Sequence, residues 1–377
     1  MSYTQNRARE AVTRLFAESK IVVDGNRKHD ITVNDDRFFV RVLAGGSLAL
    51  GESYMEGWWD CENLDAFFGR IIAGGLEKRS AKQVRLLFDY ALALIHNRQS
   101  VDKAPAHIQA HYDFPVEVFE AMLGPSMTYT GALWKDATTL EEAQDAKHEL
   151  ICKKLNLESG MTVLDIGCGW GPLMQYVDRQ ELGVRVSGLT ISRRQFDYLD
   201  RTLGSRSRHN IALCDYRTFE GVYDRVLSVE MFEHVGQRNH RAYMKAVHGF
   251  LPRRNSLHLM QVITTPMSFR ASRTDPWLDK HIFPGSQLPS MAQILKASEG
   301  LFNLEHIEGF GLEYHPTLMA WWQNYDKAWK QLGHDMVTRR MMKYYLHFCA
   351  ALFRTGRIQV SQVVFSKGAP KTYSTAA

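Results

Sequence analysis

A glycine-rich turn directly behind a short apolar run is the feature that most constrains how this chain folds. The segment TVLDIGCGWGPL runs from Thr162 to Leu173 and places Gly167, Gly169 and Gly171 at alternate positions. Glycine lacks a Cβ, so it adopts left-handed backbone conformations and lets another molecule approach the main chain. An ordinary strand-to-helix turn explains one such glycine better than three. We therefore predict that a ligand lies against this backbone.

Strand-like and helical segments alternate from this turn to near the end of the printed sequence. This alternation predicts an α/β fold with a mostly parallel sheet covered by helices on both faces. Ligands of such sheets bind outside the carboxyl ends of the strands. The seven strand candidates are residues 162–168, 184–191, 210–216, 223–232, 256–264, 302–310 and 357–366.

The first part of the chain has a different pattern. Residues 1–95 mix short strand-like segments with two apolar helical segments, 64–76 and 81–96, and we expect a small N-terminal domain that carries membrane or dimer contacts. Residues 96–110 are polar and contain a proline, so they are the best linker candidate. Residues 111–377 are then expected to form the larger domain.

Composition excludes several classes of protein. No apolar run approaches the roughly 18 residues that a membrane-spanning helix needs, and the first twenty residues are too polar for a secretory signal. The five scattered cysteines lack metal-ligand spacing, so no metal site is predicted. The net charge of +5 fits attraction to an anionic surface, lipid or nucleic acid, without establishing one. A soluble cytoplasmic protein is expected.

The spacing of the three glycines narrows the class of ligand. G-x-G-x-G after VLD differs from the dinucleotide fingerprint G-x-G-x-x-G. It resembles the motif of Rossmann-like methyltransferases that use S-adenosyl-L-methionine (SAM). In that reading the turn accommodates the amino-acid portion of SAM, and Asp165 accepts a hydrogen bond from its ammonium group, directly or through water. The alternative is a tight turn that holds no ligand.

Further candidate cofactor contacts follow the next two strands. The second strand ends in GLTISRRQ, which has no acidic residue, so Thr190, Ser192 and Gln195 are the polar candidates for holding the ribose. Asp215, followed by Tyr216, ends the third strand and is placed to reach the adenine amino group. A single aspartate at a strand end is also a common turn former.

Motifs along nearly the whole chain resemble those of the cyclopropane-fatty-acyl-phospholipid synthases. They are SLALGESYMEGWWDC, VLDIGCGWG, GLTIS, DYR, MFEHVG, DPWLDKHIFPG, TLMAWWQNYDKAW and IQVSQVVFSKG. The resemblance implies a SAM-dependent methyltransferase domain that acts on the cis double bond of unsaturated phospholipid acyl chains and makes cyclopropane fatty acids, with bicarbonate as the base. It also implies a peripheral protein on the inner face of the membrane, a homodimer, and no nucleic-acid partner.

The resemblance assigns roles to individual residues. Glu233 in MFEHVG matches the family's active-site glutamate, which orients bicarbonate and takes up its proton, and His234 follows it. Tyr314 matches the bicarbonate-binding tyrosine, and Ile263 a position that contributes a backbone contact. Tyr129, with Thr130 beside it, matches a tyrosine near the SAM carboxylate.

The chain departs from the family pattern at two of these positions. Gly131 stands where the family has a cysteine, and Gln261 stands where it has a histidine, with Met260 as the other alignment. Glutamine donates a hydrogen bond but cannot become cationic or shuttle a proton. These departures weaken the expected bicarbonate site, so methyl transfer is better supported than ring closure.

Three alternatives to cyclopropane formation remain open at this point. The first is a SAM-dependent C-methyltransferase that makes methyl- or methylene-branched lipids without closing a ring. The second is a methyltransferase acting on a small molecule. The third is a non-catalytic protein that binds lipid or SAM.

Overall fold

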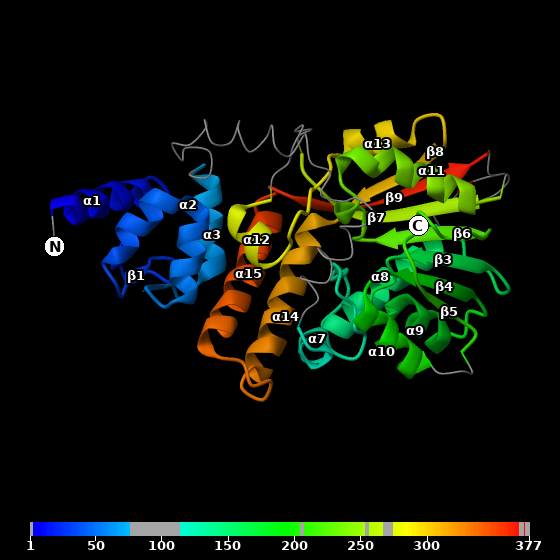
Figure 1. Cartoon of the computed structure of the whole chain (residues 1–377), viewed down its shortest axis with the longest axis horizontal. Coiled ribbons are helices and arrows are strands. Elements are labelled where there is room, and N and C mark those ends of the chain that lie inside the picture. Colours follow the sequence, from blue (N-terminus) through cyan, green and yellow to red (C-terminus); the bar gives the residue numbers. More distant parts are fainter. Residues whose placement is uncertain are drawn as a thin grey trace. The chain divides into compact units, whose positions relative to one another are not determined.

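Figure 1 shows the computed structural model of the protein, which describes residues 3–75, 114–203, 207–252, 256–266, 274–368 and 373. The predicted helix at 81–96 and the predicted linker at 96–110 lie outside the described residues. The described residues form two compact units. The helical unit lies within residues 1–96, 273–284 and 315–358, and the sheet unit lies within residues 97–272, 285–314 and 359–377.

The sheet unit contains a seven-stranded sheet with the strand order β5-β4-β3-β6-β7-β9-β8. From β5 to β7 all neighbouring strands pair in parallel, whereas β9 pairs antiparallel with both β7 and β8. This topology confirms the predicted α/β fold with a mostly parallel, seven-stranded sheet. The strands are β3 (Thr162–Ile166), β4 (Arg185–Thr190), β5 (Asn210–Leu213), β6 (Arg225–Val229), β7 (Ser256–Thr264), β8 (Asn303–Gly309) and β9 (Gln359–Lys367).

Helices cover both faces of this sheet (Figure 1). Alternate strand residues point to opposite sides, so the same strands contribute apolar side chains to a core on each face. Leu164 and Val226 pack into a core with α11 (His240–Phe250) and α13 (Met291–Ser298). Their neighbours Val163 and Leu227 pack into a second core with α8 (Leu140–Lys154), α9 (Pro172–Arg179) and α10 (Arg193–Leu203). The remaining short elements are α7 (Val116–Leu123), η1 (Phe232–His234), η2 (Gln237–Asn239) and η3 (Gly311–Glu313).

The helical unit has an aromatic core. Trp59 is fully buried, donates from Nε1 to the backbone oxygen of Leu50 at 3.0 Å, and contacts the rings of Phe38 and Phe67. The elements of this unit are α1 (Tyr3–Glu18), β1 (Thr32–Val33), α2 (Arg37–Met55), β2 (Trp59–Asp60), α3 (Leu64–Ala73), α12 (Pro276–His281), α14 (Tyr314–Ala328) from its second residue onward, and α15 (Met336–Arg354).

The helical unit takes in two segments that the sequence assigned to the larger domain. Residues 274–284 belong to it because Trp277 of α12 packs so closely on Gly51 of α2 that a Cβ there would overlap the indole. Residues 315–358 belong to it because Tyr344 of α15 packs against Phe68 of α3 in a T-shaped arrangement, with the ring centroids 4.8 Å apart. The compact units therefore differ from the predicted boundary at residue 111.

Candidate active site

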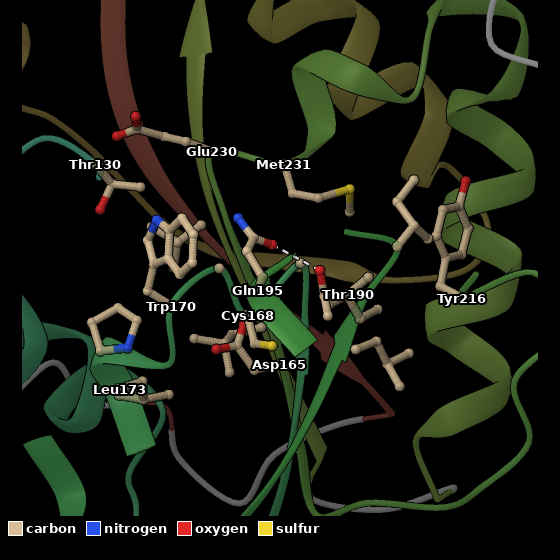
Figure 2. Close-up of a pocket in the computed structure, with 18 of the residues that line it drawn as sticks. Thr130, Asp165, Cys168, Trp170, Leu173, Thr190, Gln195, Tyr216, Glu230 and Met231 are labelled. Atoms are coloured by element: carbon tan, nitrogen blue, oxygen red, sulfur yellow. Dashed lines mark hydrogen bonds between the residues drawn. The ribbon is translucent and has the colours of Figure 1, made fainter. Parts of the chain in front are cut away.

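A pocket opens at the carboxyl ends of the parallel strands, where ligands of such sheets bind. Its walls include the glycine-rich turn after β3, Thr190 at the end of β4 and Glu230 after β6 (Figure 2). Asp215, after β5, also lines it. The sequence candidates that line it are Tyr129, Thr130, Asp165, Gly167, Gly169, Thr190, Gln195, Asp215, Tyr216 and His234.

All three glycines of the turn have a left-handed backbone. The φ angles of Gly167, Gly169 and Gly171 are 83°, 56° and 74°. A Cβ on Gly167 would lie 2.6 Å from Cγ of Met231, so this glycine also allows close packing. Gly171 is the N-cap of α9 and does not line the pocket, whereas a Cβ on Gly169 would meet no atom within 4 Å. Gly169 is therefore the position at which the main chain borders open space in the pocket.

Asp165 places a buried carboxyl group beside this turn. It lies in β3, is 4% exposed and lines the pocket. Burial raises the pKa of Asp165 to about 7, while the positive charge of Lys147 acts in the opposite direction. A cationic ligand would favour the ionised form further. The ammonium group of SAM fits this environment, and the open main chain at Gly169 leaves room for it.

The neutral residues after β4 form a hydrogen-bonded group. Thr190 Oγ1 donates to Oε1 of Gln195 at 2.7 Å, a contact drawn in Figure 2, and the backbone N–H of Ser192 donates to Thr190 Oγ1 at 3.1 Å. Ser192 also accepts from the backbone of Gln195 at 3.4 Å and does not line the pocket. Thr190 and Gln195 thus remain the candidates for a ribose, and Ser192 shapes the turn that carries them.

Asp215 and Tyr216 form another part of the pocket wall. The carboxylate of Asp215 accepts hydrogen bonds from the Arg217 side chain at 2.6 and 2.9 Å and from its backbone at 2.9 Å. Burial acts to raise the pKa of Asp215, but these hydrogen bonds outweigh it and the pKa is lowered. Any contact with an adenine amino group would share a carboxylate already held by Arg217.

Three of the residues predicted at the bicarbonate site converge on a glutamate that the sequence analysis did not single out. Glu230 Oε1 accepts from the backbone N–H of Gly131 at 2.9 Å and from Nε2 of Gln261 at 2.8 Å. Its Oε2 accepts from the hydroxyl of Tyr314 at 2.6 Å. Met260, the other alignment candidate, packs instead in the apolar core, so Gln261 is the residue at the site.

Glu233 provides a second carboxyl group nearby in the chain. Its side chain is 3% exposed, Oε1 accepts from the backbone N–H of Ile263, and Oε2 has no hydrogen-bond partner among the described residues. Burial and the charge of Glu230 raise the pKa of Glu233 to about 8. The adjacent His234 lines the pocket, and burial lowers its pKa to about 4. Near neutral pH, Glu233 is therefore protonated and His234 uncharged.

Lys147 is another functional candidate that sequence reasoning missed. It lies on α8, is fully buried, and donates from Nζ to Oγ1 of Thr130 at 2.7 Å. Burial lowers the pKa of Lys147, and the charges of Glu230 and Asp165 act in the opposite direction. No local signal marked Lys147, because polar residues lie on most sides of α8 and only the fold shows that this one is buried.

The described residues contain neither a metal site nor a membrane-spanning helix. The described ranges contain no group of three or more His, Cys, Asp or Glu side chains placed to hold a metal ion. Within the same ranges, no helix combines the length and the apolar character that crossing a bilayer requires.

The seven-stranded sheet, the glycine turn after its first long strand and the buried Asp165 define a Rossmann-like, SAM-dependent methyltransferase. A family model described as mycolic acid cyclopropane synthetase matches residues 99–363, and the chain belongs to this family.

Two curated relatives extend the comparison beyond the sheet unit. The chain is 41% identical over 356 residues to the cyclopropane-fatty-acyl-phospholipid synthase of Escherichia coli (strain K12), covering 94% of this chain and 92% of the relative. It is 30% identical over 350 residues to the tuberculostearic acid methyltransferase UfaA1 of Mycobacterium tuberculosis, covering 88% and 81%. The family resemblance predicted from the motifs is confirmed.

A solved structure supports the cofactor class. The mycolic acid cyclopropane synthase CmaA1, complexed with SAH and CTAB, is 32% identical with a TM-score of 0.62, and the match covers 69% of this chain and 97% of that one. SAH is the demethylated product of SAM. The chain is accordingly a SAM-dependent enzyme.

Proposed function

We propose that this enzyme transfers one carbon from SAM to the cis double bond of an unsaturated phospholipid acyl chain and closes a cyclopropane ring. The observation that carries the proposal is the 41% identity, over 94% of this chain, to a cyclopropane-fatty-acyl-phospholipid synthase. The buried carboxyl group of Glu230 supports it, since ring closure needs a group that accepts a proton.

Bound SAM would supply a methyl group on a positively charged sulfur. In our proposal Asp165 and the turn at Gly169 hold its amino-acid end, and Thr190 with Gln195 holds its ribose. The apolar part of the pocket wall, including Trp170, Leu189 and Met231, would exclude water. Exclusion matters because attack by the double bond leaves a carbocation on the acyl chain, which water would quench.

Bicarbonate was the base expected from the family resemblance. The side chains of Gln261 and Tyr314, two of its predicted ligands, donate to Glu230, and so does the backbone of Gly131. This arrangement does not fit an additional bicarbonate ion, because a small anion would compete with the Glu230 carboxylate for the same hydrogen bonds.

A methyl-branched product is the second candidate. The observation that favours it is the 30% identity to a relative named as a methyltransferase and not as a cyclopropane synthase. The two products differ in which proton leaves the carbocation. Loss from the added carbon closes the ring, whereas loss from a neighbouring chain carbon leaves a methyl branch.

Membrane contact follows from a phospholipid substrate. The excess of basic over acidic residues, +5 in net charge, supports contact with an anionic lipid surface. We propose a peripheral association on this ground. A cytoplasmic location and a homodimer stay predictions from the family resemblance.

Incubation with SAM and vesicles of an unsaturated phospholipid tests the proposal. Acyl chains analysed by mass spectrometry should gain the mass of one CH₂ group, and vesicles of saturated phospholipid are the control. No mass gain on any unsaturated phospholipid, together with turnover of a small amine, would favour a small-molecule methyltransferase. Saturable SAM uptake without methyl transfer to either substrate would indicate a binding protein.

A further inference from the structure

We propose that the carboxylate of Glu230 is the built-in base of this enzyme and takes the place in which bicarbonate was expected. The inference rests on the proposed function and deepens it, because it names the group that receives the proton during ring closure. It also makes the reaction independent of bicarbonate.

Three hydrogen-bond donors surround the carboxylate of Glu230. One oxygen accepts from Gly131 and Gln261 at 2.9 and 2.8 Å, and the other accepts from Tyr314 at 2.6 Å. A planar, three-oxygen anion would be recognised by such convergent donors. Here the protein supplies the anion from its own chain, tethered after β6.

A chain of buried hydrogen bonds fixes which end of the Gln261 amide faces Glu230. Lys154 Nζ, which can only donate, gives a 2.8 Å hydrogen bond to Oε1 of Gln362. The Nε2 of Gln362 then donates to Oε1 of Gln261 at 3.0 Å, so Nε2 of Gln261 faces Glu230. The chain of hydrogen bonds therefore presents a donor to Glu230, which suits an ionised carboxylate.

The two departures from the family pattern are explained by the same group. A Cβ at Gly131 would lie 2.8 Å from Cδ2 of the Tyr314 ring, so a cysteine there would displace the ring from its hydrogen bond to Glu230. Gln261 places a hydrogen-bond donor next to Glu230. Unlike the histidine of the family pattern, it cannot add a positive charge to that of Lys147. The two departures and Glu230 thus form one consistent arrangement.

The backbone of Glu230 supports a functional role. Its φ of 51° is in the left-handed region, which costs a non-glycine residue about 1 kcal/mol or more. Strained residues cluster at functional sites, and at Glu230 the strained backbone carries a buried carboxylate that three donors hold.

The charges around Glu230 suit a proton acceptor. Burial raises the pKa of the Glu230 carboxyl, against the hydrogen bonds from Tyr314, Gln261 and Gly131 and the charge of Lys147. A raised pKa makes the ionised carboxylate a stronger base. Glu233 is the other acidic group that interacts with it, and its own raised pKa keeps it protonated near neutral pH.

The step assigned to Glu230 couples proton transfer to ring closure. The double bond has already formed a C–C bond to the methyl carbon, whose C–S bond has broken with release of the neutral sulfide. A C–H bond of that new methyl group then breaks, and its proton goes to a carboxylate oxygen of Glu230. The C–H electron pair closes the third side of the ring on the carbocation. The neutral Glu230 later returns its proton to solvent.

Two substitutions at Glu230 test separately whether its side chain must fill the space between the three donors and whether it must accept the proton. Glu230→Gln keeps a planar group between the three donors but cannot accept the proton, whereas Glu230→Gly opens the place and suits the left-handed backbone. In buffer freed of carbon dioxide, wild-type turnover on unsaturated vesicles should be unchanged, and both variants should lose about a hundredfold or more. Added bicarbonate should raise the turnover of Glu230→Gly by about tenfold or more above its value in that buffer. It should not raise the turnover of Glu230→Gln.

Binding provides a readout besides activity. Titration of ¹³C-labelled bicarbonate followed by NMR should show saturable binding to Glu230→Gly and none to the wild type. Glu181 also has a left-handed backbone, with φ of 52°, and is exposed after α9, so Glu181→Gly and Glu181→Gln are matched controls that should keep wild-type turnover. Unchanged unfolding temperatures and SAM affinities would show that the Glu230 variants are folded.

The failures of the two proposals are distinct. Wild-type turnover that falls when bicarbonate is removed, or Glu230→Gln with near wild-type turnover, would overturn the assignment of Glu230 and leave the proposed function intact. A wild type that modifies no unsaturated phospholipid would overturn the proposed function and the base assignment with it.

Discussion

The hydroxyl of Tyr314 donates a 2.6 Å hydrogen bond to Oε2 of Glu230, across 84 positions of the sequence. Tyr314 is the first residue of α14, and Glu230 directly follows the last residue of β6. This contact links a residue predicted to bind an anion with a carboxylate that provides one. It is the basis for the first prediction.

Tyr314→Phe should keep the ring beside Gly131 and remove only the donated hydrogen bond. A hydrogen bond to a charged group contributes roughly 1.5–3 kcal/mol, so turnover should fall by about one to two decades. SAM affinity, measured by calorimetry, should stay within about twofold of the wild type, a change under 0.5 kcal/mol. Wild-type turnover in this variant would mean that the contact has no role in the chemistry.

Gly131→Ala should disturb the same contact through crowding. The new Cβ would lie 2.8 Å from the Tyr314 ring, and such overpacking costs typically about 1–3 kcal/mol of unfolding free energy. Gly249→Ala, in the exposed part of α11 with open space around it, is the matched control and should be neutral or slightly stabilising. Chemical denaturation of both variants measures the difference. Equal stabilities would show that the ring is free to move aside.

Asp165→Asn should weaken SAM binding. The change removes the negative charge expected to face the ammonium group, and one lost charge-assisted hydrogen bond corresponds to roughly tenfold or more in affinity. Asp200→Asn, on the exposed side of α10, serves as the control. Isothermal titration of SAM into each variant gives the comparison. An unaltered dissociation constant for Asp165→Asn would remove this residue from the cofactor site.

The protonation of Glu233 should appear as pH-dependent stability. Its pKa rises from an ordinary 4.5 to about 8 in the folded state. Between these values the unfolded chain has lost a proton that the folded chain retains, so increasing pH favours unfolding. Glu233→Gln removes this effect.

Urea denaturation at several pH values measures that difference. The unfolding free energy of the wild type minus that of Glu233→Gln should decline on the order of 2–4 kcal/mol between pH 5 and pH 8, and should level off above the folded pKa. Parallel stability curves for the two proteins would contradict a protonated Glu233 at neutral pH.

Much of the sheet unit could be predicted from local patterns. The segment 256–264 was predicted as a strand, and β7 has these bounds, Ser256–Thr264. Apolar runs separated by helical segments encode such strands in consecutive residues. The pocket position followed from the glycine turn in the same way, because the carboxyl ends of parallel strands meet at one edge.

The candidate base could not be predicted from local patterns. Glu230 acquires its environment from Gly131, Gln261 and Tyr314, which lie 99, 31 and 84 positions away. Each of the four residues has an ordinary explanation on its own. Likewise, residues 315–358 join the helical unit because of packing against α2 and α3, and no composition change in the sequence marks that boundary.

Methyl-deuterated SAM, supplied to the enzyme with vesicles of a singly unsaturated phospholipid, tests the central claim most directly. If the double bond receives the CD₃ carbon and a deuteron is then lost from that carbon, mass spectrometry will find two deuterium atoms in each modified acyl chain, and NMR will find a cyclopropane ring. Three retained deuterium atoms on a methyl branch would contradict ring closure, and acyl chains without deuterium would contradict the account as a whole.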